Sequence, residues 1–198
     1  MEKRELVDLY VAKQLSSAQI AAELGCSVNK VNYWLAKHSI PKRSISDAIY
    51  AKYHPDGDPF RAAKIDTLEK AELYGMGLGL YWGEGTKANK HSIRLGNTDP
   101  HLLKMFIRFL VELYEINKHD LRFGLQVFSD ISPNTSLEYW VSELGVSEKQ
   151  FYKIHITPSS SIGTYRQKSQ HGVITVYYHN KRLRDIIVNA LPRYDMPR

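Results

Sequence analysis

Polar side chains at helical spacing between residues 28 and 37 could bind nucleic acid. If Val28, Val31 and Leu35 point into a helical core, the remaining side chains lie together on the outer face. These outer residues are Asn29, Lys30, Asn32, Tyr33 and Lys37. Asparagine amides hydrogen-bond to base edges and lysines contact phosphates, which Lys42 and Arg43 could also reach. The pattern favours DNA binding over the alternative, a small helical packing module.

The composition of the chain agrees with a folded protein that binds a polyanion. Its 198 residues are 43% hydrophobic and 24% charged, which excludes a collagen-like, low-complexity or wholly disordered protein. The net charge is +6, and between Lys149 and Arg184 there are seven basic residues and no Asp or Glu. A solvated basic loop is the alternative interpretation of this stretch.

Other classes of protein are disfavoured by what the sequence lacks. No apolar run reaches the roughly 18 residues that a membrane span requires. Cys26 is the only cysteine, so neither an intramolecular disulfide nor a cysteine-based zinc site can form. The 8 histidines show no zinc-ligand spacing. We therefore expect a soluble, cytoplasmic protein that makes no membrane contact, associated with the nucleoid if it is bacterial or from a phage.

Three short helices at the N-terminus are predicted to position the polar outer face. The first spans about residues 3–12. Ser16 and Gln19 have the spacing of a capping box, which starts the second helix immediately after Ser16. Gly25 ends that helix and Ser27 caps the third, since glycine tolerates a left-handed helix end and serine accepts a hydrogen bond from the first turn.

The stretch from Leu15 to Leu35 closely resembles the helix-turn-helix family. In that family the second helix of the motif enters the DNA major groove. The resemblance implies that residues 1–45 form a DNA-binding domain. Residues 46–65 have weak periodicity and contain a cluster of turn formers, so we predict a linker there.

Residues 66–198 are predicted to form an α+β domain with helices on one face of a sheet. The expected elements are a helix over Leu68–Glu84, a strand pair across Thr86–Asn97, a helix from Asp99 to Tyr114, a strand at Arg122–Phe128, a short helix over Leu137–Leu144, a strand at Val173–Tyr178 and a last helix over Leu183–Leu191. Because the strand at Arg122–Phe128 alternates apolar and polar residues, the second face of the sheet is expected to be polar and free.

Three glycines mark one face of the predicted helix at Leu68–Glu84. Gly75, Gly79 and Gly83 lie four residues apart, and a glycine inside a helix costs about 0.8 to 1 kcal/mol relative to alanine. A stripe without side chains lets another helix approach closely, so we predict a helix–helix interface there. The alternative is a glycine-rich turn between two shorter elements.

The segment at residues 77–85, GLGLYWGEG, resembles a diverged LAGLIDADG motif of homing endonucleases. The elements over about residues 66–192 are similar to the αββαββα domain of that family, with a mixed or antiparallel four-stranded sheet. The resemblance implies that two such helices pack together and that the last acid of each binds a divalent metal. Trp82 replaces the first acid of the motif, and Glu84 stands in place of the final aspartate. A single motif per chain implies a homodimer.

The resemblance also implies the residues of an active site. Glu84 matches the metal-binding acid and would act in catalysis with Mg²⁺ and a lysine, for which we favour Lys168 over Lys87 and Lys153. Glu84 could instead cap the next turn or pair with Lys87. The residues expected to contact DNA in this domain are Lys87, Lys90, Arg94, Arg122, Gln126, Lys153 and Arg166.

Taken together, the sequence predicts a homing-endonuclease-like protein that binds double-stranded DNA sequence-specifically and cleaves it as a homodimer with Mg²⁺. The two-fold symmetry of a homodimer predicts a near-palindromic target. One alternative is a non-catalytic transcription regulator built on the same scaffold. Another is an oligomeric scaffold whose basic surface has no role.

Overall fold

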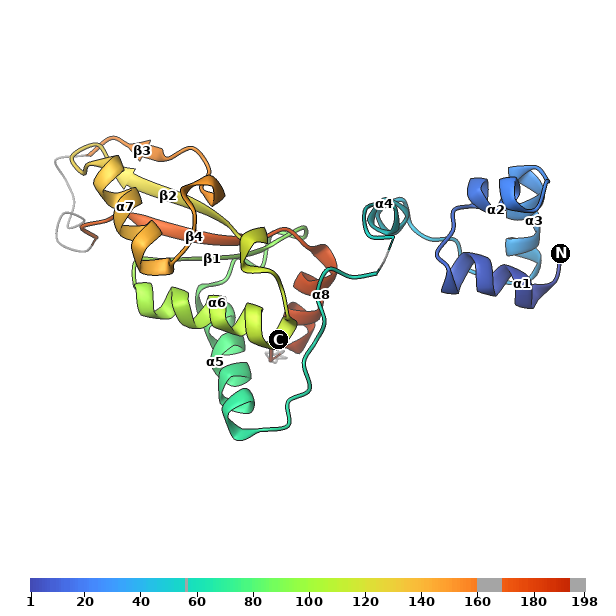
Figure 1. Ribbon diagram of the computed structural model, residues 1–198, viewed down its shortest axis with the longest axis horizontal. Coiled ribbons are helices and arrows are strands. Elements are labelled where there is room, and N and C mark those ends of the chain that lie inside the picture. The colour runs from blue at the N-terminus through green and yellow to red at the C-terminus, as the bar shows by residue number, and fades with distance from the viewer. Residues whose placement is uncertain (56, 160–168, 193–198) are drawn as a thin grey trace, which may run out of the picture. The chain divides into compact units, whose positions relative to one another are not determined.

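The computed structural model describes residues 1–55, 57–159 and 169–192. The chain divides into two compact units, Met1–Pro59 and Phe60–Arg198, which are described here one at a time (Figure 1). The division lies inside the range 46–65 that we predicted as a linker.

The first unit begins with three helical segments around a small core. They are α1 (Lys3–Val7), which continues as the π-helical turn η1 (Asp8–Ala12), then α2 (Ser17–Glu23) and α3 (Val28–Lys37). The side chains of Leu6, Ile20, Val31 and Leu35 are fully buried and hold the segments together. The predicted capping box is confirmed, because Gln19 N donates to Ser16 Oγ and Ser16 N donates to Gln19 Oε1.

The turn between α2 and α3 has the predicted chemistry. Gly25 has a φ of +59°, in the left-handed region where glycine carries no steric penalty. The hydroxyl of Ser27 then accepts a hydrogen bond from Lys30 N at 3.3 Å and starts α3. These two residues fix the length of the turn and therefore the relative placement of the two helices.

A further helix, α4 (Ile45–Tyr53), occupies much of the predicted linker, and the weak periodicity of this stretch had not predicted it. Ser44 caps it: its hydroxyl accepts from Asp47 N at 3.1 Å and donates to Asp47 Oδ2 at 2.6 Å. Ala51 is buried, whereas the side chains of Ile45 and Tyr53 are exposed.

The second unit alternates helices with the strands of one sheet. Its elements are α5 (Leu68–Glu84), β1 (Ile93–Asn97), α6 (Pro100–Tyr114), the 3-10 turn η2 (Lys118–Asp120), β2 (Arg122–Phe128), α7 (Pro133–Leu144), the 3-10 turn η3 (Glu148–Gln150), β3 (His155–Thr157), β4 (Val173–Tyr178) and α8 (Lys181–Ala190). The sheet has the order β1-β4-β2-β3. Strand β4 is antiparallel to both β1 and β2, and β3 is parallel to β2.

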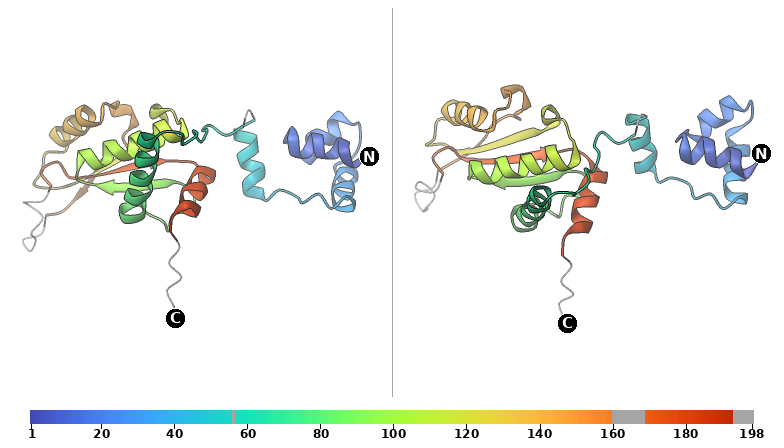
Figure 2. Two further views of the ribbon diagram at one scale, coloured as in Figure 1. Left: turned by 90° about the horizontal axis from the view of Figure 1, so that it is seen from below. Right: turned by 60° about the horizontal axis from the view of Figure 1, so that its bottom comes forward.

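The two faces of the sheet differ in burial. Alternate residues of β1, β2 and β4 are buried, among them Leu95, Phe123 and Val176, which lie opposite one another in register. Helices α6 and α7 lie on the same side of the sheet (Figure 2, left). The remaining residues of these strands form the second, polar face, as predicted.

Aromatic side chains fill the core between the helices and the sheet. Phe106 and Phe109 of α6 are fully buried, and the ring of Tyr81 from α5 stacks on Phe106 with 5.9 Å between centroids. Trp140 of α7 is also buried and donates its indole N–H to the carbonyl of His171 at 2.7 Å. Burial of each such side chain contributes roughly 1.5 to 3 kcal/mol to folding.

The α+β class and the four-stranded mixed sheet are confirmed, but the αββαββα order is not. The second unit runs αβαβαββα, because one strand, not two, lies between α5 and α6. The segment at 86–92 turns instead: Asn89 Oδ1 accepts hydrogen bonds from His91 N, Ser92 N and the Ser92 hydroxyl. The Asn89 side chain therefore accepts, within the turn, the hydrogen bonds that these amides would have donated to a neighbouring strand.

Within the ranges described above, no helix combines the length and the apolar character that a membrane crossing demands.

Candidate nucleic-acid interface

The outer face of α3 presents most of the side chains predicted to contact DNA. Asn29, Lys30, Tyr33 and Lys37 are exposed, while Val31 and Leu35 are fully buried on the opposite side. Val28 is also exposed, so its predicted inward position was wrong; it lies in the first turn, ahead of the buried stripe. Because its apolar side chains are buried on one side, α3 presents its polar side to solvent, where a ligand could bind.

Asn32 differs from its neighbours because it already has a partner. It is half-buried, and its Oδ1 accepts a hydrogen bond from the Ser17 hydroxyl at 3.1 Å. The contact joins the first residue of α2 to the middle of α3. Asn32 therefore has a positioning role between the two helices in addition to any contact with DNA.

In the C-terminal half of α3, the Lys37 side chain lies against an aromatic ring. The Lys37 ammonium lies 4.7 Å from the centroid of the Trp34 ring, and that ring stacks on His38. Cation–π contacts of this kind hold a lysine in place without neutralising its charge. Lys37 is thus held near the helix while its charge stays available to an anion.

The charged side chains on α3 and in the segment that follows it are all basic. The sequence between Glu23 and Asp47 contains four basic residues, Lys30, Lys37, Lys42 and Arg43, and no acidic residue. Three of the four lie exposed on or just after α3. A local positive field of this kind attracts the phosphate backbone of nucleic acid.

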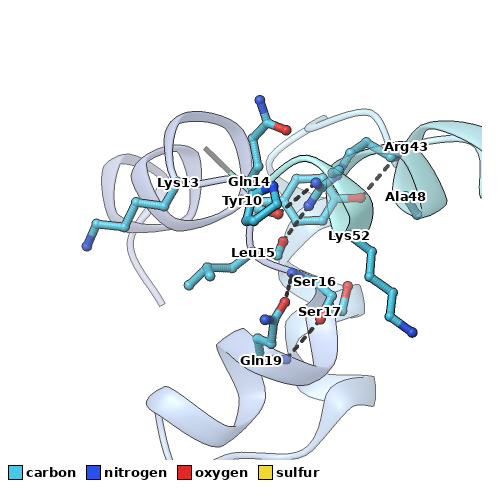
Figure 3. Close-up of a pocket in the computed structure, with 12 residues that line it drawn as sticks. Tyr10, Lys13, Gln14, Leu15, Ser16, Ser17, Gln19, Arg43, Ala48 and Lys52 are labelled. Carbon is cyan, nitrogen blue, oxygen red and sulfur yellow. Dashed lines mark hydrogen bonds between the residues drawn. The ribbon is translucent and has the colours of Figure 1, made fainter. Parts of the chain in front are cut away.

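Arg43, which we also predicted to reach the DNA backbone, differs from the three lysines because its side chain already has partners within the chain. Its guanidinium donates to the carbonyls of Gln14 and Leu15, and its own amide donates to the Tyr10 hydroxyl at 3.0 Å (Figure 3). The guanidinium also lies 4.4 Å from the centroid of the Tyr10 ring. Arg43 therefore fastens the segment after α3 to the segment before α2.

Helix α5 has one face closed against its own chain. Leu73, Gly77 and Tyr81 are buried toward α6. A Cβ added at Gly77 would overlap the ring of Phe109, so only glycine permits this close approach of α5 to α6. The sequence had drawn attention to the other glycines and not to Gly77.

The other face of α5 is open. At Gly75, Gly79 and Gly83 an added Cβ would meet no atom of the described chain within 4 Å. Met76 is 45% exposed and Trp82 is 44% exposed on the same side of the helix. The predicted smooth stripe therefore exists, and no described residue fills the space over its three glycines.

A shallow apolar groove runs beside this open stripe. It has a volume of about 410 Å³ and is lined by Met76, Gly79, Leu80, Asp99, Leu102 and Met105. Its walls come from α5 and from the first turns of α6. Five of the six lining residues are apolar, which favours an apolar occupant.

Glu84 is exposed at the C-terminal end of α5. The next residue, Gly85, pairs with Leu95 of β1, which places this end of the helix against the edge of the sheet. Lys87 does not pair with Glu84, since its ammonium donates to the carbonyl of Trp82 at 2.6 Å. Among the described residues the Glu84 carboxylate has no hydrogen bond or ion pair.

The described residues of one chain form no cluster of metal ligands. Over residues 1–55, 57–159 and 169–192, no three His, Cys, Asp or Glu side chains lie close enough to share an ion. Carboxylate oxygens are suitable ligands for Mg²⁺, but each chain offers a single one at this position. A metal site at Glu84 would need ligands in addition to the described residues of one chain.

Arg184 of α8 fixes the segment that follows Glu84, and the sequence did not single it out for this role. Its guanidinium donates to the carbonyl of Lys87 at 2.6 Å and to Asp185 at 2.9 Å. Its Nε is buried and has no partner among the described residues. The contact joins α8 to residue 87 across 97 positions of sequence, which no local pattern reveals.

The polar face of the sheet brings together three of the predicted residues. Arg94 of β1 and Arg122 of β2 both lie opposite Tyr177 of the central strand β4. Gln126 lies on the same face further along β2, where its amide donates to the Thr157 hydroxyl at 3.0 Å. Tyr152 and His179 join this group, and the sequence analysis had not identified either as a site residue.

The remaining predicted residues are not brought into these groups. Lys90 and Lys153 are exposed in connecting segments. Lys168 and Arg166 lie outside the described residues, so their predicted roles are neither supported nor contradicted.

Comparisons with protein-family models, with curated proteins and with solved structures give no match to this chain. The assignment of function consequently depends on the residues and their geometry.

Proposed function

We propose that this protein binds double-stranded DNA sequence-specifically, as a homodimer, with α3 as the recognition helix. The observation that carries the proposal is the outer face of α3, where Asn29, Lys30, Tyr33 and Lys37 are exposed in a stretch with no acidic residue. Amide side chains supply base contacts and the lysines supply phosphate contacts. The capped turn between α2 and α3 gives this face a fixed orientation on its domain.

The first experiment selects bound duplexes from a random pool and measures the affinity of the selected duplex at two salt concentrations. About six phosphate contacts would weaken binding roughly a thousandfold between 50 and 200 mM salt. Lys30→Gln should lower affinity and reduce the salt dependence by about one phosphate contact. Lys3→Gln, an exposed lysine on α1, is the matched control and should leave both unchanged. Salt-independent binding, or no enrichment of any sequence, would reject the proposal.

The homodimer is proposed to form through the open face of α5. An unoccupied glycine stripe next to an apolar groove fits a second copy of the same helix, because a two-fold axis brings identical surfaces together. A two-fold dimer presents two copies of α3 and so calls for two half-sites in the DNA.

A second candidate function is cleavage of that DNA with Mg²⁺, as the resemblance to LAGLIDADG endonucleases implies. The observation that favours it is the exposed Glu84 carboxylate, without a partner in the described chain, at the C-terminal end of the same helix. Two such carboxylates in a dimer would supply oxygen ligands that Mg²⁺ accepts. The metal would stabilise the charge that develops during phosphodiester hydrolysis.

Incubation of the protein with its selected duplex and Mg²⁺ separates the endonuclease from the non-catalytic regulator. The endonuclease predicts strand cleavage by the wild type and intact DNA with Glu84→Gln. Both proteins should bind the duplex equally in the presence of EDTA, which controls for folding. Intact DNA in both reactions would leave the regulator as the function.

A further inference from the structure

The polar face of the sheet holds a row of two arginines and a tyrosine. Tyr177 on the central strand has Arg94 beside it on β1 and Arg122 beside it on β2. The Arg94 guanidinium lies over the Tyr177 ring at 5.3 Å from its centroid. Strand pairing therefore places both arginines on the same face of the sheet, one on each side of Tyr177.

His179 extends this row past the end of β4. Its ring is nearly parallel to that of Tyr177, with 6.0 Å between centroids. Its Nε2 forms a hydrogen bond of 2.7 Å with the hydroxyl of Tyr152, whose ring meets Tyr177 edge-on. The imidazole Nδ1 has no hydrogen-bond partner among the described residues. One side of the ring is thus fixed, and one nitrogen remains for a ligand.

Among the described residues, no acidic side chain neutralises the positive charges of this group. Arg94 Nε donates to the Ser92 hydroxyl at 2.9 Å. Arg122 Nη1 donates to the backbone carbonyls of His119 and Leu121 at 2.8 and 2.9 Å. All three acceptors are uncharged. In the described part of the chain, neither guanidinium forms an ion pair with Asp or Glu.

We infer that Arg94, Arg122 and His179 form an oxyanion-binding site on the polar face of the sheet, which takes a phosphodiester group and holds it more tightly when His179 is protonated. The choice of a phosphodiester over another oxyanion rests on the proposed function, since DNA would supply it. Guanidinium and imidazolium groups are the donors that bind such oxygens most strongly in proteins.

The proton enters through His179, because histidine is the side chain whose ordinary pKa lies between about pH 5 and 8. The groups that face its ring are Tyr152, Tyr177, Arg94 and Arg122. Burial, with smaller contributions from the charges of Arg94 and Arg122, lowers the pKa of His179. A bound anion opposes the effect of those charges, so binding should raise this pKa and affinity should increase as pH falls.

Sulfate provides a direct probe, because it keeps its charge over this pH range and has the tetrahedral oxygens of a phosphate. The measurement is the pKa of the His179 imidazole by NMR in the full-length protein, with and without sulfate at constant ionic strength. The expected result is a rise of about half a unit or more, equivalent to roughly threefold tighter binding to the protonated form. His101 on α6, which is exposed and outside the cluster, is the internal control.

Two variants test whether the arginines form the site. Arg122→Gln and, separately, Arg94→Gln should remove most of the sulfate-induced shift while leaving the near-UV circular dichroism spectrum unchanged. A His179 pKa that is the same with and without sulfate in the wild type would overturn the inference. So would a shift that persists in full in both variants.

Affinity measurements with duplex DNA distinguish a failure of this inference from a failure of the proposed function. If both are right, affinity for the selected duplex rises between pH 8 and 5.5 in the wild type, and the rise is smaller in His179→Gln. DNA binding with the same pH profile in both proteins retains the proposed function and overturns the phosphodiester site. A sulfate-induced shift without any DNA binding retains the oxyanion site and rejects the proposed function.

Discussion

The two faces of α5 show that the same residue type serves different purposes a few residues apart. On the closed face, Gly77 is buried and leaves room for the Phe109 ring. On the open face, Gly79 has no atom within 4 Å of its missing side chain. Glycine lowers helix stability by about 0.8 to 1 kcal/mol at either position. Among the described residues, packing offsets this cost at Gly77 and not at Gly79.

The comparison teaches that a glycine stripe alone does not say whether the partner helix belongs to the same chain. For Gly77 the partner is α6. For Gly75, Gly79 and Gly83 the described chain offers none, which is why we assign that face to a second copy. The predictions below test this difference.

The largest effect is expected for Gly77→Ala. The added methyl overlaps a phenylalanine ring that is itself fully buried, so the variant should lose about 1 to 3 kcal/mol of folding free energy. Urea unfolding of the full chain measures this as a lower midpoint at an unchanged slope. Gly79→Ala, the matched change on the open face, meets no atom of its own described chain within 4 Å. At protein concentrations where the chain is monomeric, it should leave the free energy of unfolding unchanged or raise it by up to about 1 kcal/mol. Equal losses in the two variants would contradict the division into faces.

The second prediction concerns Gly79→Leu, which adds a bulky side chain on the open face. The protein should remain folded while the dimer dissociates at least about tenfold more readily, equivalent to ~1.4 kcal/mol. Sedimentation equilibrium measures the dissociation constant. Ser142→Leu on the exposed side of α7 is the control for a surface leucine and should leave association unchanged. A Gly79→Leu dimer as stable as the wild type would move the interface elsewhere.

The third prediction, with a smaller expected effect, distinguishes the roles of Asn29 and Asn32 on α3. Asn29→Ala should remove base preference at one position of each half-site, by about 1 to 3 kcal/mol, without changing stability. Asn32→Ala also breaks the contact with Ser17 and should lower stability by about 0.5 to 1.5 kcal/mol. Selection profiles and thermal unfolding of both variants provide the test. If Asn29→Ala left the profile unchanged, the sheet and not α3 would read the sequence.

Local sequence signals predicted most of the helices and strands. Helix α5 and strands β2 and β4 have the bounds expected from periodicity, and Asp99 caps α6 as predicted. These elements depend on side-chain alternation and on caps, which involve residues close in sequence. The signal for α4 was also present, since Ser44 and Asp47 have the spacing of a helix cap. The cluster of turn-forming residues that follows nevertheless favoured a linker over a helix.

The features that the sequence did not reveal depend on contacts between distant residues. The three-residue strand β3 pairs with β2 at the edge of the sheet and is too short for alternation to mark it. The structural role of Arg43 and the grouping of Arg94, Arg122 and His179 follow from how the segments meet in space. Residue type had suggested nucleic-acid contact for both arginines of the sheet, and the strand register places them on either side of Tyr177.

The mass of the protein–DNA complex tests the central proposal most directly. Multi-angle light scattering of the full-length protein with its selected duplex should give two chains per duplex, and one chain per half-site duplex in the Gly79→Leu variant. A complex of one wild-type chain on a full target, with base preference intact, would contradict the proposal that two copies of α5 join to place two recognition helices on DNA.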